Sequence, residues 1–137
     1  MSILLIDDSP DDRLLLQAIL SAAGYENIIA TDCAAAAFKQ LGLDGGKQGL
    51  ARVDLILMDM QMPVLDGYDA TTRLRQAGYT HPIVALTAHA GSLDRGRCLQ
   101  AGCDDYATKP IDRKRLLEIV AQWVDRRRAP SQISDGF

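Results

Sequence analysis

Short, uninterrupted hydrophobic runs recur along the chain and predict buried strands. The clearest are Ile3–Ile6, Leu55–Met58 and Ile83–Leu86, and weaker strands are predicted at Ile28–Ala30 and Asp105–Thr108. Continuous apolar runs are typical of strands that are covered on both faces, as in a parallel sheet. The pattern therefore predicts a sheet buried between two layers.

The segments between these runs have helical periodicity and helix-end signals. The first begins after Ser9, a suitable N-cap, and ends at Gly24, with a predicted apolar face of Leu15, Ile19 and Ala22. Further helices are predicted from Asp32 to Leu41, from Asp66 to Gly78, from Ser92 to Gly102 and from Asp112 onward, the last with an apolar stripe of Leu116, Val120 and Trp123. Strands that alternate with helices predict an α/β fold with a parallel sheet.

Size and composition narrow the class of protein. The chain has 137 residues, of which 47% are hydrophobic and 24% charged, with a net charge of −3. These values predict one globular domain, over residues 1–125, followed by a basic stub and polar tail at 126–137. They predict neither a broad basic surface for nucleic acid nor a membrane span, and with no secretion signal we expect a cytoplasmic protein.

The cysteines do not suggest a metal or disulfide framework. Cys33, Cys98 and Cys103 are odd in number and lack C-x-x-C spacing. We expect them to be small buried residues in a reducing compartment.

Charged or polar side chains follow the predicted strands at their carboxyl ends. Asp7 and Asp8 follow the first strand, Asp59 the third, Thr87 the fourth and Lys109 the fifth. Parallel strands bring their carboxyl ends to one edge, where ligands bind in open α/β sheets. Carboxylates gathered there repel one another by ~4 kcal/mol per pair at 4 Å, so the cluster predicts either a bound cation or a chemical role. Oxygen ligands without nearby His or Cys favour Mg²⁺.

The same residue types suit phosphoryl chemistry. A carboxylate can accept a phosphoryl group and form an acyl phosphate. Lys109 and Thr87 could then hold the oxygens of the transferring group, with metal and ammonium offsetting its charge.

Four segments carry a family resemblance, each in order and at a predicted strand end. They are L-L-I-D-D-S-P-D-D at 4–12, L-I-L-M-D-M-Q-M-P-V-L-D-G at 55–67, V-A-L-T-A at 84–88 and D-Y-A-T-K-P at 105–110. Over residues 2–125 the chain resembles the receiver domain of two-component response regulators, particularly receivers of hybrid sensor kinases and single-domain regulators. The resemblance implies a flavodoxin-like, doubly wound (βα)5 fold with a five-stranded parallel sheet in strand order 2-1-3-4-5.

The resemblance also implies an acceptor and a metal site. Asp59 would accept a phosphoryl group from a histidine kinase or a histidine phosphotransfer protein. Asp8 and Asp59 would bind Mg²⁺ together with the backbone carbonyl of Gln61, and Asp7 would act through a metal-bound water. The chain would be a phosphorylation switch that acts on a protein target unidentified by the sequence, and it would not turn over a separate substrate.

Other residues would transmit or time the signal if the resemblance holds. Thr87 and Lys109 would bind phosphoryl oxygens, Tyr106 would be the switch aromatic, and the Lys109–Pro110 peptide bond would be cis. Gln61 and His89 would line the route of the hydrolytic water and tune the phosphoryl lifetime.

Three alternatives remain at this point. The first is a Mg²⁺-dependent aspartyl-phosphate phosphatase of the haloacid-dehalogenase kind, a class that has a D-x-D motif on the first strand. Here the candidate nucleophile, Asp59, is on the third strand, and Gln61 occupies the position of the acid/base. A flavodoxin-like flavin module would need a phosphate-binding loop where this chain has an acidic one. The chain could also be a receiver fragment of a hybrid histidine kinase.

Overall fold

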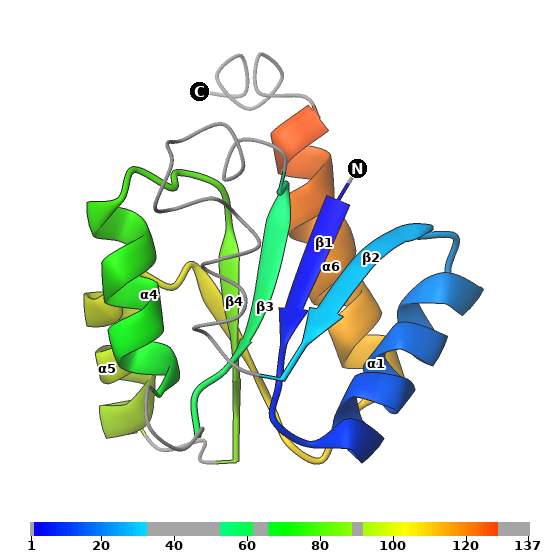
Figure 1. The fold of residues 1–137 in the computed structure, drawn as a ribbon, viewed down its shortest axis with the longest axis horizontal. Helices are drawn as coiled ribbons and strands as arrows, with labels where there is room; N and C mark the ends of the chain where they lie inside the picture. Colours follow the sequence, from blue (N-terminus) through cyan, green and yellow to red (C-terminus); the bar gives the residue numbers. More distant parts are fainter. Residues whose placement is uncertain (1, 33–52, 62–65, 89–91, 129–137) are drawn as a thin grey trace.

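Five parallel strands form one sheet in the order β2-β1-β3-β4-β5 (Figure 1). This computed structural model describes residues 2–32, 53–61, 66–88 and 92–128. The strands are β1 (Ser2–Ile6), β2 (Asn27–Thr31), β3 (Leu55–Asp59), β4 (Ile83–Thr87) and β5 (Asp105–Thr108). Both the fold class and the strand order are as predicted. Since every pairing is parallel, all five carboxyl ends lie along one edge.

Helices cover both faces of this sheet. In the described part of the chain they are α1 (Pro10–Ala22), α4 (Gly67–Gln76), α5 (Ser92–Ala101) and α6 (Arg113–Arg128). Helices α1 and α6 pack on one face, and α4 and α5 on the other (Figure 1). The predicted helix at 32–41, together with Cys33 and His89, lies outside the described residues.

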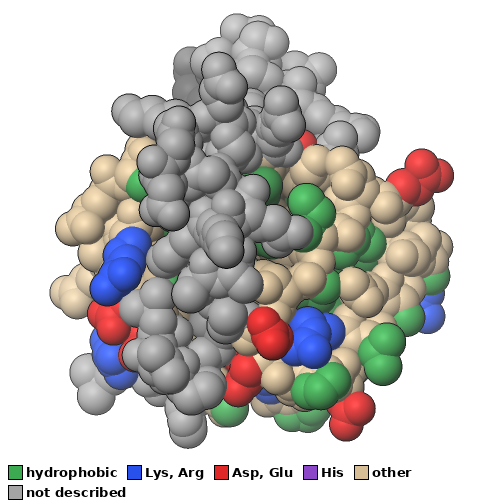
Figure 2. Space-filling view, viewed as in Figure 1, with side chains coloured by type: hydrophobic (Ala, Val, Ile, Leu, Met, Phe, Trp, Pro, Cys, Tyr) green, Lys and Arg blue, Asp and Glu red, His purple; other side chains and the backbone are tan. Residues whose placement is uncertain are grey.

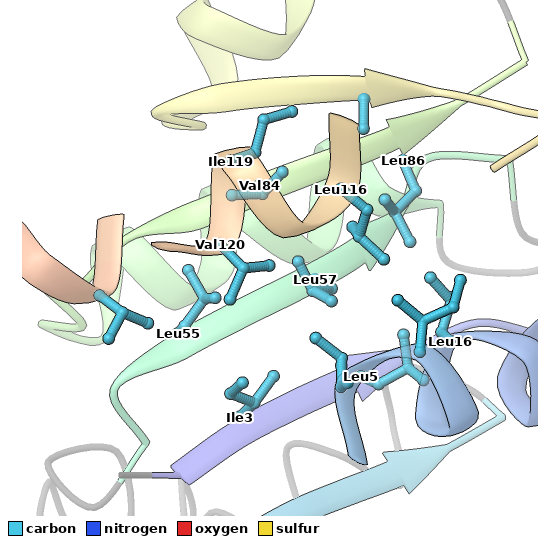
Figure 3. Packing of buried hydrophobic residues seen from close by; sticks show 14 residues of the cluster. Ile3, Leu5, Leu16, Leu55, Leu57, Val84, Leu86, Leu116, Ile119 and Val120 are labelled. Atoms are coloured by element: carbon cyan, nitrogen blue, oxygen red, sulfur yellow. The ribbon is translucent and has the colours of Figure 1, made fainter. Parts of the chain in front are cut away.

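Alternate side chains of each central strand enter opposite layers of the core. In β1, Ile3 and Leu5 face α1 and α6, whereas Leu4 and Ile6 face α4 and α5. Figure 3 shows the first of these layers, where side chains from β1, β3 and β4 meet Leu16, Leu116, Ile119 and Val120. Burial on both sides explains why the strands read as unbroken apolar runs.

Helix α1 begins as predicted but turns a different face to the core. Ser9 is the N-cap, and its hydroxyl accepts a hydrogen bond from the backbone N–H of Asp12 at 3.3 Å. The buried residues are Leu16, Ile19 and Leu20, whereas Leu15 is 45% exposed and Ala22 is also exposed. The prediction was therefore right for Ile19 but wrong for Leu15 and Ala22. Leu14, Leu15 and Leu16 are consecutive, and periodicity alone did not determine which of them is buried.

The last helix follows its prediction. Leu116 and Val120 are buried, and Trp123 packs at the margin of the same core. The Trp123 indole N–H donates to a carboxylate oxygen of Asp105 at 3.0 Å, which ties α6 to β5. The helix continues through Arg128.

The two described cysteines are structural. Cys98 and Cys103 are buried free thiols, as expected. Burial raises the pKa of the Cys103 thiol to about 12. In the described residues, no helix combines the length and the hydrophobicity that crossing a bilayer requires.

Candidate functional site

Three carboxylates converge at the carboxyl edge of the sheet. Asp7 directly follows β1 and Asp59 ends β3, and both are buried, whereas the neighbouring Asp8 is exposed. One oxygen from each of the three side chains lies within 4.8 Å of the others. This all-oxygen, net-negative donor set fits a hard divalent cation such as Mg²⁺.

The backbone holds the two buried carboxylates in the same way. The N–H of Ser9 donates to Asp7 Oδ1 at 3.0 Å, and the N–H of Gln61 donates to Asp59 Oδ1 at 3.0 Å. In both cases the donor lies two residues further along the chain, which is the geometry of an Asx turn. Each Oδ2 then faces Lys109.

The Lys109 ammonium is shared among three carboxylates. Its Nζ lies 3.0 Å from Asp7 Oδ2, 3.0 Å from Asp12 Oδ2 and 3.5 Å from Asp59 Oδ2. Burial favours a lower pKa for Lys109, but hydrogen bonds to Asp12 and Asp7 and the charge of Asp59 outweigh it and raise the pKa. The ammonium is therefore charged and fixed beside Asp59.

The contact with Asp12 is a site feature that the sequence did not reveal. Asp12 lies in the first turn of α1. Its partner Lys109 is 97 residues away. Only the packing of the loop after β5 against the start of α1 brings the two together.

The environment of Asp59 favours its neutral form. Burial raises the pKa of its carboxyl to about 7, with the charge of Asp7 adding to this effect, while the Gln61 N–H and Lys109 oppose it. A bound cation would favour the ionised form instead, since an adjacent positive charge lowers a carboxyl pKa. Burial and positive charge thus act in opposite directions on the ionisation of Asp59.

The side chain of Gln61 bridges from the end of β3 to the end of β4. Its Nε2 donates to the hydroxyl of Thr87 at 3.1 Å, and its Oε1 accepts from the backbone N–H of Ala88 at 3.0 Å. Thr87 is buried at the end of β4. The sequence predicted only a role for the Gln61 backbone carbonyl and for water access, because a side-chain rotamer has no sequence signal.

Tyr106 lies on β5. It is half-buried against the core layer beneath α4 and α5, and the guanidinium carbon of Arg95 lies 5.7 Å from its ring centroid. The Lys109–Pro110 peptide bond is cis, as predicted.

Close packing at the start of α4 supports the end of β3. Asp66 is the N-cap, and its side chain accepts from the N–H of Asp69 at 2.9 Å. A methyl group added at Gly67 would lie 2.5 Å from the carbonyl oxygen of Asp59. Only glycine fits here without moving the strand that carries Asp59.

Exposed hydrophobic side chains lie close to the acidic site. Leu14 is 67% exposed and Leu15 is 45% exposed, both within the first turns of α1. Figure 2 shows acidic and hydrophobic side chains at the lower edge of the molecule, where α1 begins.

Comparison with known proteins decides the family. Residues 3–121 match the response regulator receiver domain. The chain belongs to this family.

The relatives of this receiver include both long and short proteins. It is 36% identical over 141 residues to the sensor histidine kinase GacS of Pseudomonas protegens, covering 97% of the chain but 14% of that protein. It is 35% identical over 121 residues to the two-component response regulator ORR41 of Oryza sativa subsp. japonica, covering 88% of the chain and 92% of that protein. The receiver thus spans a small part of the sensor kinases that it matches and nearly all of a stand-alone regulator.

A solved receiver structure agrees with this fold and carries a metal ion. The receiver domain of the sensor histidine kinase PA1611 from Pseudomonas aeruginosa superposes with a TM-score of 0.76 and 38% identity, covering 90% of this chain and 97% of that one. That structure has a magnesium ion coordinated in its active site cleft.

Proposed function

We propose that this receiver accepts a phosphoryl group on Asp59 from a phosphohistidine of a histidine kinase or a histidine phosphotransfer protein. The observation that carries the proposal is the buried Asp59 carboxylate, 3.5 Å from the Lys109 ammonium and within 4.8 Å of oxygens of Asp7 and Asp8. Phosphorylation would then change a protein-binding surface, and no separate substrate would be turned over.

The transfer follows from the chemistry of the acceptor. A carboxylate oxygen of Asp59 attacks the phosphorus, the P–N bond of the phosphohistidine breaks, and the imidazole nitrogen keeps the electron pair and takes up a proton. The product is an acyl phosphate on Asp59. Lys109 offsets the negative charge that gathers around the transferring group, because it is already held beside the acceptor.

The acidic cluster supports a requirement for Mg²⁺. Asp8, Asp59 and the backbone carbonyl of Gln61 would hold the ion, with Asp7 acting through a metal-bound water. When bound, Mg²⁺ would supply positive charge to the carboxylates and to the phosphoryl oxygens. The magnesium-bound relative from Pseudomonas aeruginosa supports this choice of metal.

Thr87 and Tyr106 are the proposed switch residues. Thr87 ends the strand beside the acceptor strand, and Tyr106 lies on the next strand along the sheet. A phosphoryl group on Asp59 would attract the Thr87 hydroxyl, and movement of Thr87 would let the Tyr106 ring change position. Tyr106 lies under Arg95 of α5, so this helix is the element that would respond.

The start of α1 is the proposed contact for the donor protein. A phosphohistidine must come within bonding distance of Asp59, so its carrier has to cover the edge where α1 begins. Leu14 and Leu15 offer exposed apolar surface on that helix. A cytoplasmic location is part of this proposal, since the phosphoryl groups of histidine kinases derive from ATP.

Incubation with acetyl phosphate and Mg²⁺, followed by intact mass spectrometry, tests the proposal. We expect one phosphoryl adduct on the parent chain and on Asp11→Asn, a matched control in the exposed first turn of α1. We expect none with Asp59→Asn or in EDTA. An adduct that survives Asp59→Asn would contradict the assignment of the acceptor.

A further inference from the structure

The Gln61 side chain forms hydrogen bonds with groups at the end of β4, the strand beside β3. Its backbone N–H donates to Asp59 Oδ1, while its carboxamide contacts the Thr87 hydroxyl and the Ala88 N–H. Gln61 thus links the Asp59 carboxylate at the end of β3 with the Thr87 hydroxyl and the Ala88 N–H at the end of β4. Gln61 is itself exposed, so it can leave this position without opening the core.

A phosphoryl group on Asp59 would compete for the same groups. It brings oxygens that are strong hydrogen-bond acceptors and carry up to two negative charges. The Ala88 N–H is a donor directed toward this space, but the acceptor it now contacts is Gln61 Oε1. Two acceptor oxygens cannot share that donor at full strength, and they repel one another at close range.

We propose that Gln61 is a positioning residue that holds Thr87 and Ala88 in the unphosphorylated arrangement and must be displaced before they can contact a phosphoryl group. The inference rests on the proposed function. In it, Gln61 competes with the phosphoryl group for Thr87 and Ala88. Gln61 thereby opposes the phosphorylated state through two hydrogen bonds, independently of any effect on hydrolytic water.

Substitutions at position 61 give opposite predictions for the affinity of beryllofluoride, a phosphoryl mimic, in the presence of Mg²⁺. Gln61→Ala and the similarly shaped Gln61→Met remove both hydrogen bonds, so we expect binding about 3- to 10-fold tighter, the effect of one or two exposed neutral hydrogen bonds. Gln61→Glu keeps an oxygen for the Ala88 N–H and adds a negative charge, so we expect weaker binding.

The affinity is measured by titration of each variant with beryllofluoride in a calorimeter. Gln76→Ala is the matched control, an exposed glutamine at the end of α4 remote from Asp59, and should bind like the parent. A role in water access alone would change the dephosphorylation rate and leave beryllofluoride affinity unchanged, and that result would overturn the proposal.

Amide hydrogen exchange at Ala88 tests the same contact without any phosphoryl group. We expect Gln61→Ala and Gln61→Met to exchange this amide faster than the parent, and unchanged exchange would contradict the proposed contact.

Failure of the proposed function and failure of this inference are distinguishable. If the parent forms no phosphoryl adduct and binds no beryllofluoride, the proposed function fails and this inference fails with it. If the parent does both and position 61 is without effect, only this inference fails.

Discussion

The ammonium of Lys109 lies 3.0 Å from a carboxylate oxygen of Asp12, a residue in the first turn of α1. The same ammonium is 3.5 Å from Asp59, so Asp12 and Asp59 share one positive charge. Asp12 is partly exposed, with a side chain 32% accessible, whereas Lys109 is 18% accessible.

We expect Asp12→Asn to bind beryllofluoride more tightly, because it removes a negative charge that both attracts Lys109 and repels the incoming anion. Partly exposed ion pairs contribute ~0–1 kcal/mol, so the expected gain is about 2- to 5-fold. Asp11→Asn is the control, since it removes an equivalent charge from the same turn, whereas the ion pair with Lys109 is made by Asp12. An equal gain in both variants would point to a general charge effect and would contradict a specific role of Asp12.

Because the pKa of Asp59 is raised, we expect the free energy of unfolding to depend on pH. The pKa is about 7 in the folded chain against 3.8 for the ordinary value, so the folded state binds the extra proton between these limits. Without metal, the free energy of unfolding therefore falls as the pH rises from about 4 to about 7. Asp59→Asn lacks this loss and should be more stable than the parent above pH 7, on the order of 2 kcal/mol.

Urea unfolding in EDTA at several pH values measures this difference. The advantage of Asp59→Asn should shrink as the pH falls from 7 toward 4, because the folded parent takes up a proton and no longer buries the charge. Adding Mg²⁺ at pH 8 should stabilise the parent more than the variant, because ligands that bind the folded state stabilise it. A difference that is independent of pH would contradict the assigned pKa.

Because Leu14 is exposed on α1, we expect its substitution to slow phosphoryl transfer from a protein donor more than transfer from a small-molecule donor. Leu14→Asp should slow transfer from a phosphohistidine protein at least several-fold, because it replaces apolar contact surface with a charge beside an acidic site. Transfer from acetyl phosphate, which needs no protein contact, should remain within about twofold of the parent. Leu99→Asp is the control, because Leu99 is similarly exposed, at 51%, but lies on α5 across the sheet. Equal slowing with both donors would argue against a docking role for Leu14.

The position of the site could be predicted from the sequence, because the ends of the strands can be recognised in it. Apolar runs that stop at Asp7 and Asp59 predicted both the strands and the edge at which their carboxylates meet, and the structure has the same edge. Turn chemistry was readable too, since Ser9 and Asp66 cap the helices as expected.

Relationships that depend on tertiary packing were not readable. Ile19 of α1 was predicted correctly, but Leu15 was predicted in place of Leu16, since the consecutive leucines fit two adjacent faces and contact with the sheet decides between them. The Asp12–Lys109 contact and the Gln61 bridge depend on loop geometry and side-chain rotamers. Periodicity and spacing carry no information about either.

Chemical trapping of the acyl phosphate tests the central claim most directly. The receiver is incubated with a phosphohistidine protein or acetyl phosphate and Mg²⁺, then treated with borohydride, which reduces an aspartyl phosphate to homoserine, and its peptides are analysed by mass spectrometry. We predict homoserine at position 59 and at no other aspartate, dependent on both donor and metal. Homoserine at Asp7, Asp8 or another position, or none with an active donor, would contradict the account.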